Sequence, residues 1–170
     1  LDGSLRKETL YELGSQYGIP IPDQFGFSDG IGLDIALSMF QLTVSLMQDK
    51  NVIKRLVSEL CDDLYKDGVE YAEIRYAPNL HGVDLEEIVN ASCEGLKYGY
   101  KLILCGLYGN SPKTIEILVE LAKKHKDVVG VDIAGGPQNT DKWGLHHYVD
   151  AFQEAKKHNI GRTVHVSEGR

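Results

Sequence analysis

The sequence has no excess of positive charge and no long apolar run, and each absence excludes a class of protein. Lysine and arginine together number 18, against 25 aspartate and glutamate residues, so the formal net charge is -7. Binding to nucleic acid or to an anionic membrane surface needs a basic face, so we expect neither partner. No apolar stretch approaches the ~18 residues of a membrane-spanning helix. The composition is that of a soluble globular protein.

Cysteine is scarce: Cys61, Cys93 and Cys105 are the only three. An odd number without metal-type spacing predicts neither a disulfide framework nor a cysteine metal site. Cys93 and Cys105 lie within apolar patterns, where a free thiol acts as a small core residue. We therefore expect reduced thiols and a cytoplasmic location. The 170 residues suffice for a real core, and we expect 1–170 to form part of a single domain.

Four short apolar runs of strand length recur about every 30 residues, the length of a strand, a helix and two loops. They are residues 69–76, 101–107, 128–133 and 162–166. Helical patterns fill the intervals, and three further helices are predicted earlier, at residues 4–17, 33–47 and 51–66. Asp84 and Ser111 predict helix N-caps, and Gly68, Gly99 and Gly161 predict helix ends.

The alternation of strands and helices predicts an α/β fold with a parallel sheet and right-handed crossovers. The nearly continuous apolar strands agree, because parallel strands are buried on both faces. Both an open doubly wound sheet and a (βα)8 barrel of the TIM type satisfy this pattern. Polar residues follow the runs at their carboxyl ends, where barrel enzymes place their active sites, and this favours the barrel.

The last apolar run presents a candidate metal site. Strand alternation places Thr163 and His165 on one face, with Val164 and Val166 on the other. A histidine at the carboxyl end of a barrel strand can offer a ring nitrogen to a metal on the axis. Glu168, three residues later, can lean over the same opening. A His-x-x-Glu pattern is common by chance, so on its own it remains a weak indication.

Two other features have ordinary explanations. The glycines after Asp132, in the run that ends at Gly136, either let the main chain approach a ligand or form a tight turn. The remaining histidines fall in predicted loops or on helix surfaces, where we expect solvated side chains. They are His81, His125, His146, His147 and His158.

Five segments taken together resemble the adenosine deaminase branch of the metal-dependent amidohydrolases. They are residues 1–4, 68–78, 101–105, 128–135 and 162–168, and their order and spacing agree over nearly the whole chain. The resemblance implies a (βα)8 barrel with one zinc ion at its carboxyl mouth, of which this chain would hold roughly strands 2 to 5. It also implies zinc-dependent hydrolytic deamination of adenosine or 2'-deoxyadenosine to inosine or 2'-deoxyinosine plus ammonia.

By position in the resemblance, His165 is a zinc ligand and Glu168 is the acid that protonates purine N1. An enclosed apolar pocket would raise the pKa of such a carboxyl group enough to deliver a proton near pH 7.

The resemblance also assigns residues to substrate binding. Gly135 corresponds to the contact with purine N3, and Asp2 to the contact with the ribose 5'-hydroxyl. The apolar helix that covers the pocket corresponds to the segment with Leu33, Leu37 and Phe40. The implied partner is a small-molecule purine nucleoside. The implied pathway is purine salvage.

The sequence departs from the family pattern at several places. The family's His-x-His zinc ligands precede Leu1, and further ligands follow Arg170, so we expect a fragment with an incomplete ligand set that is inactive alone. Such a half-barrel would leave apolar sheet edges. Tyr108-Gly109 replaces a common Arg-His pair, an acidic residue is missing after Gly135, and Ser167 replaces a common glycine.

These departures keep alternatives open. Asp2 favours adenosine, whereas Ser167 is more typical of enzymes that act on N6-methyl-AMP; adenine is a third possible substrate. The changes at Tyr108 and Gly136 are compatible with a non-catalytic protein on the same barrel. The sequence does not predict an oligomeric state.

Overall fold

A computed structural model describes residues 1–23, 25–26, 32–82, 84–135 and 142–166, with the side chains of Leu33 and Asp34 left out. The predicted parallel sheet is present, with its four strands in the order β1-β2-β3-β4. The strands are β1 (Glu73–Tyr76), β2 (Lys101–Leu107), β3 (Val128–Ala134) and β4 (Gly161–Arg162). Sequence neighbours are therefore also neighbours in space, as in a barrel wall.

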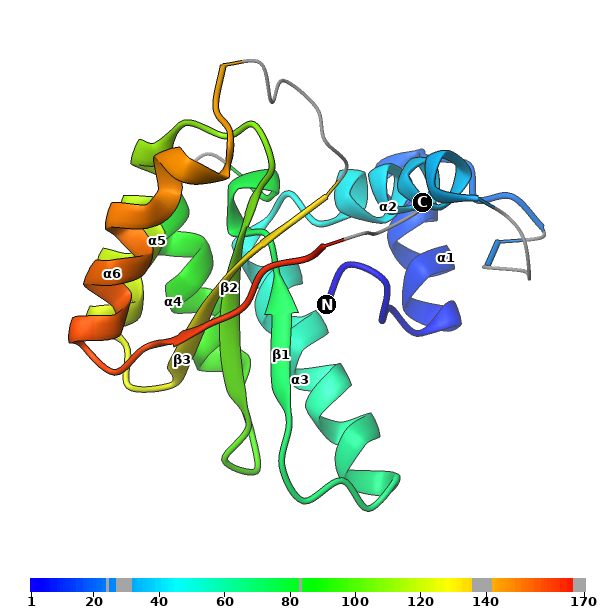
Figure 1. The fold of residues 1–170 in the computed structure, drawn as a ribbon. Helices are drawn as coiled ribbons and strands as arrows, with labels where there is room; N and C mark the ends of the chain where they lie inside the picture. Colours follow the sequence, from blue (N-terminus) through cyan, green and yellow to red (C-terminus); the bar gives the residue numbers. More distant parts are fainter. Residues whose placement is uncertain (24, 27–31, 83, 136–141, 167–170) are drawn as a thin grey trace.

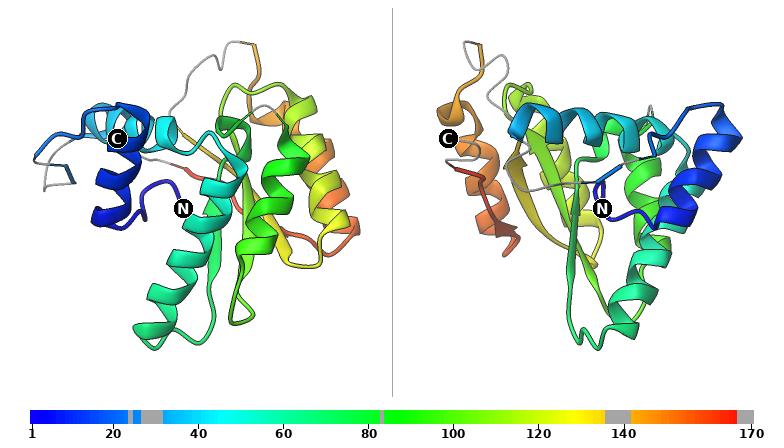
Figure 2. Two further views of the ribbon diagram at one scale, coloured as in Figure 1. Left: turned by 180° about the vertical axis from the view of Figure 1, so that it is seen from behind. Right: turned by 90° about the vertical axis from the view of Figure 1, so that its right-hand side faces the viewer.

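In the described part of the chain, six α-helices accompany the strands. They are α1 (Lys7–Tyr17), α2 (Leu33–Leu46), α3 (Lys50–Lys66), α4 (Leu85–Gly95), α5 (Pro112–Lys124) and α6 (Val149–Lys157). Short 3-10 helices occupy Pro78–Leu80 and Leu145–Tyr148. Helices α3, α4 and α5 cover one face of the sheet when it is seen from behind, whereas α2 lies across the carboxyl ends of the strands (Figures 1 and 2).

Three of the predicted capping residues mark helix boundaries, whereas Gly99 lies four residues beyond the end of α4 at Gly95. The side chain of Asp84 accepts a hydrogen bond from the backbone N–H of Glu87 at the start of α4, and Ser111 caps α5 in the same way. Gly68 follows α3 with a φ of +77°, a conformation in which glycine is favoured because it has no Cβ.

Gly161 is not the helix cap that the sequence predicted. Helix α6 ends at Lys157, Asn159 adopts the left-handed conformation with a φ of +57°, and Gly161 lies in β4 opposite Gly130. A Cβ at Gly161 would lie 3.0 Å from the carbonyl oxygen of Val129. The glycine is needed for this close approach of two strands.

Strand β4 is shorter than the predicted run, but its hydrogen bonding continues beyond Arg162. The Thr163 N–H donates to Val131 O at 3.0 Å, and the His165 N–H donates to Ile133 O at 2.9 Å. The main chain is therefore aligned with β3 as far as His165.

The two faces of the sheet have different roles. Ile74, Tyr76, Leu104, Val131 and Ile133 are buried in the core with the helices. The alternate positions of the strands face the other way, toward α2 and the amino-terminal segment. Among the residues described, no helix combines the length and the apolar character needed to cross a membrane.

Candidate functional site

A cleft of about 420 Å³ lies at the carboxyl ends of the strands. The amino-terminal segment, α2 and the strands all contribute to its walls. The lining residues include five predicted from the sequence: Asp2, Leu37, Phe40, Gly135 and His165. Leu33 begins α2, but its side chain lies outside the described part of the chain, as does the whole of Glu168. The structure therefore brings together the predicted residues that it describes.

A buried carboxylate holds the histidine at this site. His165 Nδ1 lies 3.1 Å from Asp132 Oδ2, and the Asp132 side chain is completely buried. Asp132 Oδ2 also lies 3.2 Å from Arg75 Nη1. The other carboxylate oxygen, Oδ1, is buried without a hydrogen-bond partner among the described residues. A buried carboxylate needs compensating charge or donors, and Arg75 and His165 supply them.

Cys105 completes this group. Its thiol donates to Asp132 Oδ2 at a sulfur–oxygen distance of 3.6 Å. Burial, and next the negative charge of Asp132, raise the pKa of the Cys105 thiol. Cys105 is therefore a neutral hydrogen-bond donor near neutral pH and not a thiolate nucleophile.

The strand end that carries His165 has a second support. The Tyr108 hydroxyl, just beyond β2, donates a hydrogen bond to the carbonyl oxygen of His165. The backbone N–H of Tyr108 in turn donates to Ala134 O at 2.9 Å. Tyr108, one of the departures from the family pattern, thus ties β2 to the end of β3 and to His165.

The amino-terminal segment enters the cleft beside β1. The Leu1 nitrogen donates to Arg75 O at 2.6 Å, which fixes the position of Asp2 near the carboxyl end of that strand. Gly3 follows, and a Cβ there would lie 2.9 Å from Cε1 of Phe40. The absence of a side chain at Gly3 lets the Phe40 ring of α2 rest against this segment.

His81 is not the solvated side chain that the sequence predicted. Its side chain is completely buried, with Nε2 2.9 Å from Asp2 Oδ1 and Nδ1 3.2 Å from Met47 O. Sequence patterns could not reveal this contact, because Asp2 and His81 are 79 positions apart. The prediction for His146, His147 and His158 is confirmed, because all three are exposed.

Gly135 takes a φ of +86° at the end of β3, a conformation that L side chains rarely adopt. A Cβ there would meet Leu107 Cδ2 at 3.4 Å. The positive φ explains why glycine is favoured here, and the residue also lies on the cleft wall.

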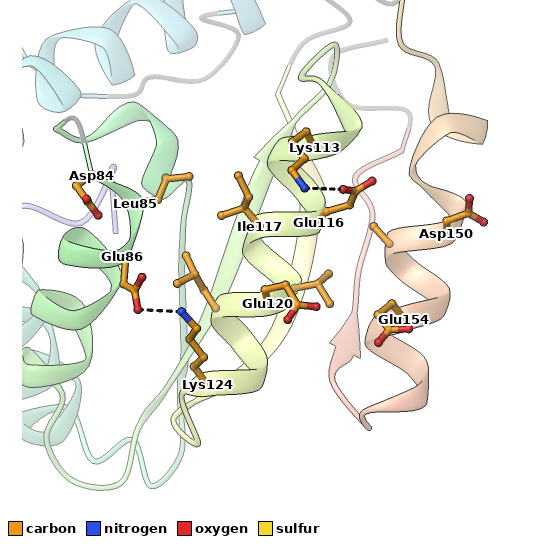
Figure 3. A pocket seen from close by; sticks show the side chains of 13 residues that line it. Asp84, Leu85, Glu86, Lys113, Glu116, Ile117, Glu120, Lys124, Asp150 and Glu154 are labelled. Atoms are coloured by element: carbon orange, nitrogen blue, oxygen red, sulfur yellow. Dashed lines mark hydrogen bonds and ion pairs between the residues drawn. The ribbon is translucent and has the colours of Figure 1, made fainter.

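A larger groove of about 650 Å³ lies among the outer helices α4, α5 and α6 (Figure 3). Two ion pairs join residues that line it: Lys113 Nζ lies 3.4 Å from Glu116 Oε2, and Lys124 Nζ lies 3.0 Å from Glu86 Oε1. Such exposed pairs are ordinary for a solvated helix surface. The smaller cleft at the strand ends is the candidate site, because the predicted residues line it and the buried Asp132 contacts its lining residues Arg75 and His165.

His165 has the arrangement expected of one metal ligand. Its Nδ1 faces a carboxylate, an arrangement that orients the ring and would let Nε2 point to a metal. Within the described ranges, however, no three His, Cys, Asp or Glu side chains converge as a metal site requires. The described residues therefore fit a single corner of a zinc site.

Comparison with known sequences identifies relatives. The family model "Adenosine deaminase" matches residues 1–169. A probable adenosine deaminase from Dictyostelium discoideum is 33% identical over 189 residues, which cover 99% of this chain and 24% of that protein. An adenosine deaminase from Clostridium kluyveri is 34% identical over 189 residues, which cover 99% of this chain and 53% of that protein. The chain spans about half, or less, of the length of these relatives.

Comparison with solved structures supports the fold. The N6-methyl-AMP deaminase from Arabidopsis thaliana superimposes with a TM-score of 0.79 at 22% identity, over 98% of this chain and 55% of that one. An amidohydrolase from Burkholderia ambifaria with bound zinc gives a TM-score of 0.82 at 19% identity, over 98% and 50%. The predicted partial (βα)8 barrel is confirmed, and an open doubly wound sheet is excluded. By its sequence and its fold, the chain belongs to the adenosine deaminase family.

Proposed function

We propose that the protein carrying this chain deaminates adenosine or 2'-deoxyadenosine by zinc-dependent hydrolysis. The observation that carries the proposal is the Asp132–His165 pair at the mouth of the cleft, with Nδ1 and Oδ2 3.1 Å apart. A histidine oriented by a buried carboxylate is a recurrent form of zinc ligand. Asp2, Leu37 and Phe40 line the same cleft, as a purine nucleoside site requires.

In this proposal His165 would hold zinc, together with ligands from outside the described residues. Zinc in such a site supplies a Lewis acid that makes water a good nucleophile near neutral pH. Asp132 keeps the His165 ring in the correct tautomer. Arg75 offsets the negative charge of the buried Asp132 carboxylate.

The remaining roles concern the substrate. Glu168 donates a proton to purine N1, which makes C6 electrophilic. Gly135 offers a backbone contact to N3, and Asp2 accepts a hydrogen bond from the ribose 5'-hydroxyl. The α2 side chains, Leu37 and Phe40 with Leu33, exclude water from the base.

N6-methyl-AMP is the second candidate substrate. A deaminase of this nucleotide is among the structural neighbours, and Ser167 before Glu168 points the same way. The carboxylate of Asp2 opposes it, because a 5'-phosphate would bring like charges together where a neutral hydroxyl would not. We therefore prefer the nucleoside.

The test is steady-state turnover of adenosine, adenine and N6-methyl-AMP by the protein expressed from its complete reading frame, with zinc supplied. The highest kcat/KM is expected for adenosine. A higher value for N6-methyl-AMP or adenine would reassign the substrate. No turnover of any of the three would favour a non-catalytic protein on the same barrel.

A cytoplasmic location and a role in purine salvage belong to the same proposal. The three unpaired cysteines and the small-molecule cleft support them.

A further inference from the structure

His81 connects two parts of the cleft wall that are far apart in the sequence. Its ring bridges Asp2, in the amino-terminal segment, and the carbonyl oxygen of Met47, at the end of α2. The ring is completely buried, whereas the Asp2 side chain is 18% exposed and lines the cleft. One partner of the bridge therefore faces the ligand space and the other belongs to the covering helix.

The two contacts occupy both nitrogens of the imidazole ring. Nδ1 lies 3.2 Å from Met47 O, and Nε2 lies 2.9 Å from Oδ1 of Asp2. Among the described residues, no contact of this kind engages Oδ2 of Asp2, so this oxygen can accept a hydrogen bond from a ligand.

The loop that carries His81 is itself anchored. The Gln48 side chain donates to Leu80 O at 2.9 Å and accepts from the Gly82 N–H at 3.1 Å. The His81 N–H donates to Pro78 O at 3.1 Å, and the ring packs against Tyr76 with centroids 5.8 Å apart. The imidazole is therefore fixed before any ligand binds, which lowers the entropic cost of orienting Asp2.

We propose that His81 is a positioning residue for ribose recognition: it turns the Asp2 carboxylate so that its second oxygen receives the 5'-hydroxyl of the nucleoside. This inference rests on the proposed function and adds a determinant of substrate choice. Without His81 the Asp2 side chain is free to rotate away, and the 5'-hydroxyl loses its partner.

The experiment compares adenosine with 5'-deoxyadenosine, which lacks the hydroxyl that Asp2 would bind. In the protein from the complete reading frame, His81→Asn keeps a donor near Met47 O but cannot reach Asp2. We expect the KM for adenosine to rise about tenfold with kcat nearly unchanged, the cost of one charge-assisted hydrogen bond. The KM for 5'-deoxyadenosine should not change, so the preference for adenosine falls about tenfold.

Three further variants separate positioning from general stability. His81→Gln places an amide donor near the position of Nε2 and should restore part of the preference. Asp2→Asn should remove the preference for adenosine over 5'-deoxyadenosine. Adding His81→Asn to this variant should change the preference little further, because both residues act through one contact. Ser92→Ala removes the buried hydrogen bond to the Tyr76 hydroxyl, and should lower stability while leaving the preference intact.

If His81→Asn raises the KM for both nucleosides by the same factor, or leaves the preference for adenosine unchanged, the inference is overturned. The proposed function would remain in place. If the wild-type protein turns over neither nucleoside, the proposed function fails. The inference is then tested by calorimetric binding of the same two nucleosides to the wild type and to His81→Asn. A preference for adenosine in the wild type that the variant loses would support it, and any other result would overturn it.

Discussion

Asp132 in β3 and His165, three residues beyond β4, face each other with Oδ2 and Nδ1 3.1 Å apart. The pair depends on the main-chain alignment of this strand end with β3, in which the His165 N–H donates to Ile133 O. Because Asp132 is completely buried and Arg75 reaches the same oxygen, the carboxylate has little freedom to move. The sheet therefore fixes the direction of the histidine ring.

Replacing Asp132 should weaken zinc binding while the strand end that carries His165 stays folded. Asp132→Asn removes the charge that orients His165, and we expect zinc affinity to fall about 10- to 100-fold. Competition with a chromogenic chelator measures the change. Asp127→Asn is the matched control, because Asp127 lies before β3 and pairs with Lys101 instead. Equal zinc affinities in wild type and Asp132→Asn would contradict this role.

Changes at His165 and Glu168 should separate metal binding from proton transfer. His165→Ala should lose zinc and turnover together. Glu168→Gln should retain zinc, while kcat falls by at least about 100-fold, the usual contribution of general acid catalysis. Metal analysis and steady-state kinetics on the same preparations provide the two measurements. An unchanged kcat in Glu168→Gln would remove this residue from the mechanism.

Tyr108→Phe should loosen the support of His165 without removing a ligand. The hydroxyl that donates to His165 O is lost, so we expect a several-fold decrease in zinc affinity, smaller than that for Asp132→Asn. Tyr98→Phe serves as the control, because its hydroxyl binds Asp62 on an exposed helix surface. A larger effect from Tyr98→Phe would show that the hydroxyl of Tyr108 is unimportant.

Gly106→Ala should destabilise the fold by overpacking. A Cβ there would lie 2.0 Å from Cδ1 of Ile115, and such collisions typically cost about 1–3 kcal/mol. Ile115→Val removes that methyl group, so the double variant should recover part of the loss. The measurement is the free energy of unfolding in urea. Strict additivity of the two single changes would contradict the predicted collision.

Alkaline pH should destabilise the protein through its thiols. Burial raises the pKa of Cys93 from its ordinary 9.0 to about 11, and burial also raises the pKa values of Cys61 and Cys105. The folded state therefore holds these protons more tightly than the unfolded chain. The resulting stabilisation is fully present below about pH 9 and decreases as the pH rises toward 11.

Urea unfolding measured across this range tests the thiol contribution. A variant with all three cysteines changed to alanine should lose less stability between pH 9 and 11 than the wild type, whatever its stability at neutral pH. Identical pH dependence in the two proteins would show that other groups, such as tyrosines and lysines, account for the decrease.

The elements could be predicted because their signals are local. Asp84 and Ser111 mark helix starts by hydrogen bonds within three residues, and the apolar runs mark buried strands. The prediction for Gly161 is wrong for the same reason. A glycine after a helix usually ends it, but this glycine allows the close approach of the Val129 carbonyl oxygen on another strand.

The candidate site was predictable only in part. The sequence predicts His165 from its place at a strand end and from five segments in register, and the structure places it on the cleft wall. The ion pairs and hydrogen bonds that form the site join residues that are far apart in the sequence. Asp132 contacts Arg75, and His81 contacts Asp2. No pattern in the sequence measures whether a particular histidine becomes buried, because this depends on which helix covers it.

The alternation of core and cleft residues along β3 limits how this sequence can change in length. Val131 and Ile133 belong to the core, and Asp132 between them holds the cleft histidine. Deleting or inserting one residue in the strand would exchange these sets, moving an aliphatic side chain to the site and a carboxylate into the core. Homologous proteins should therefore tolerate insertions between strands and helices, while keeping the number of residues within each strand constant.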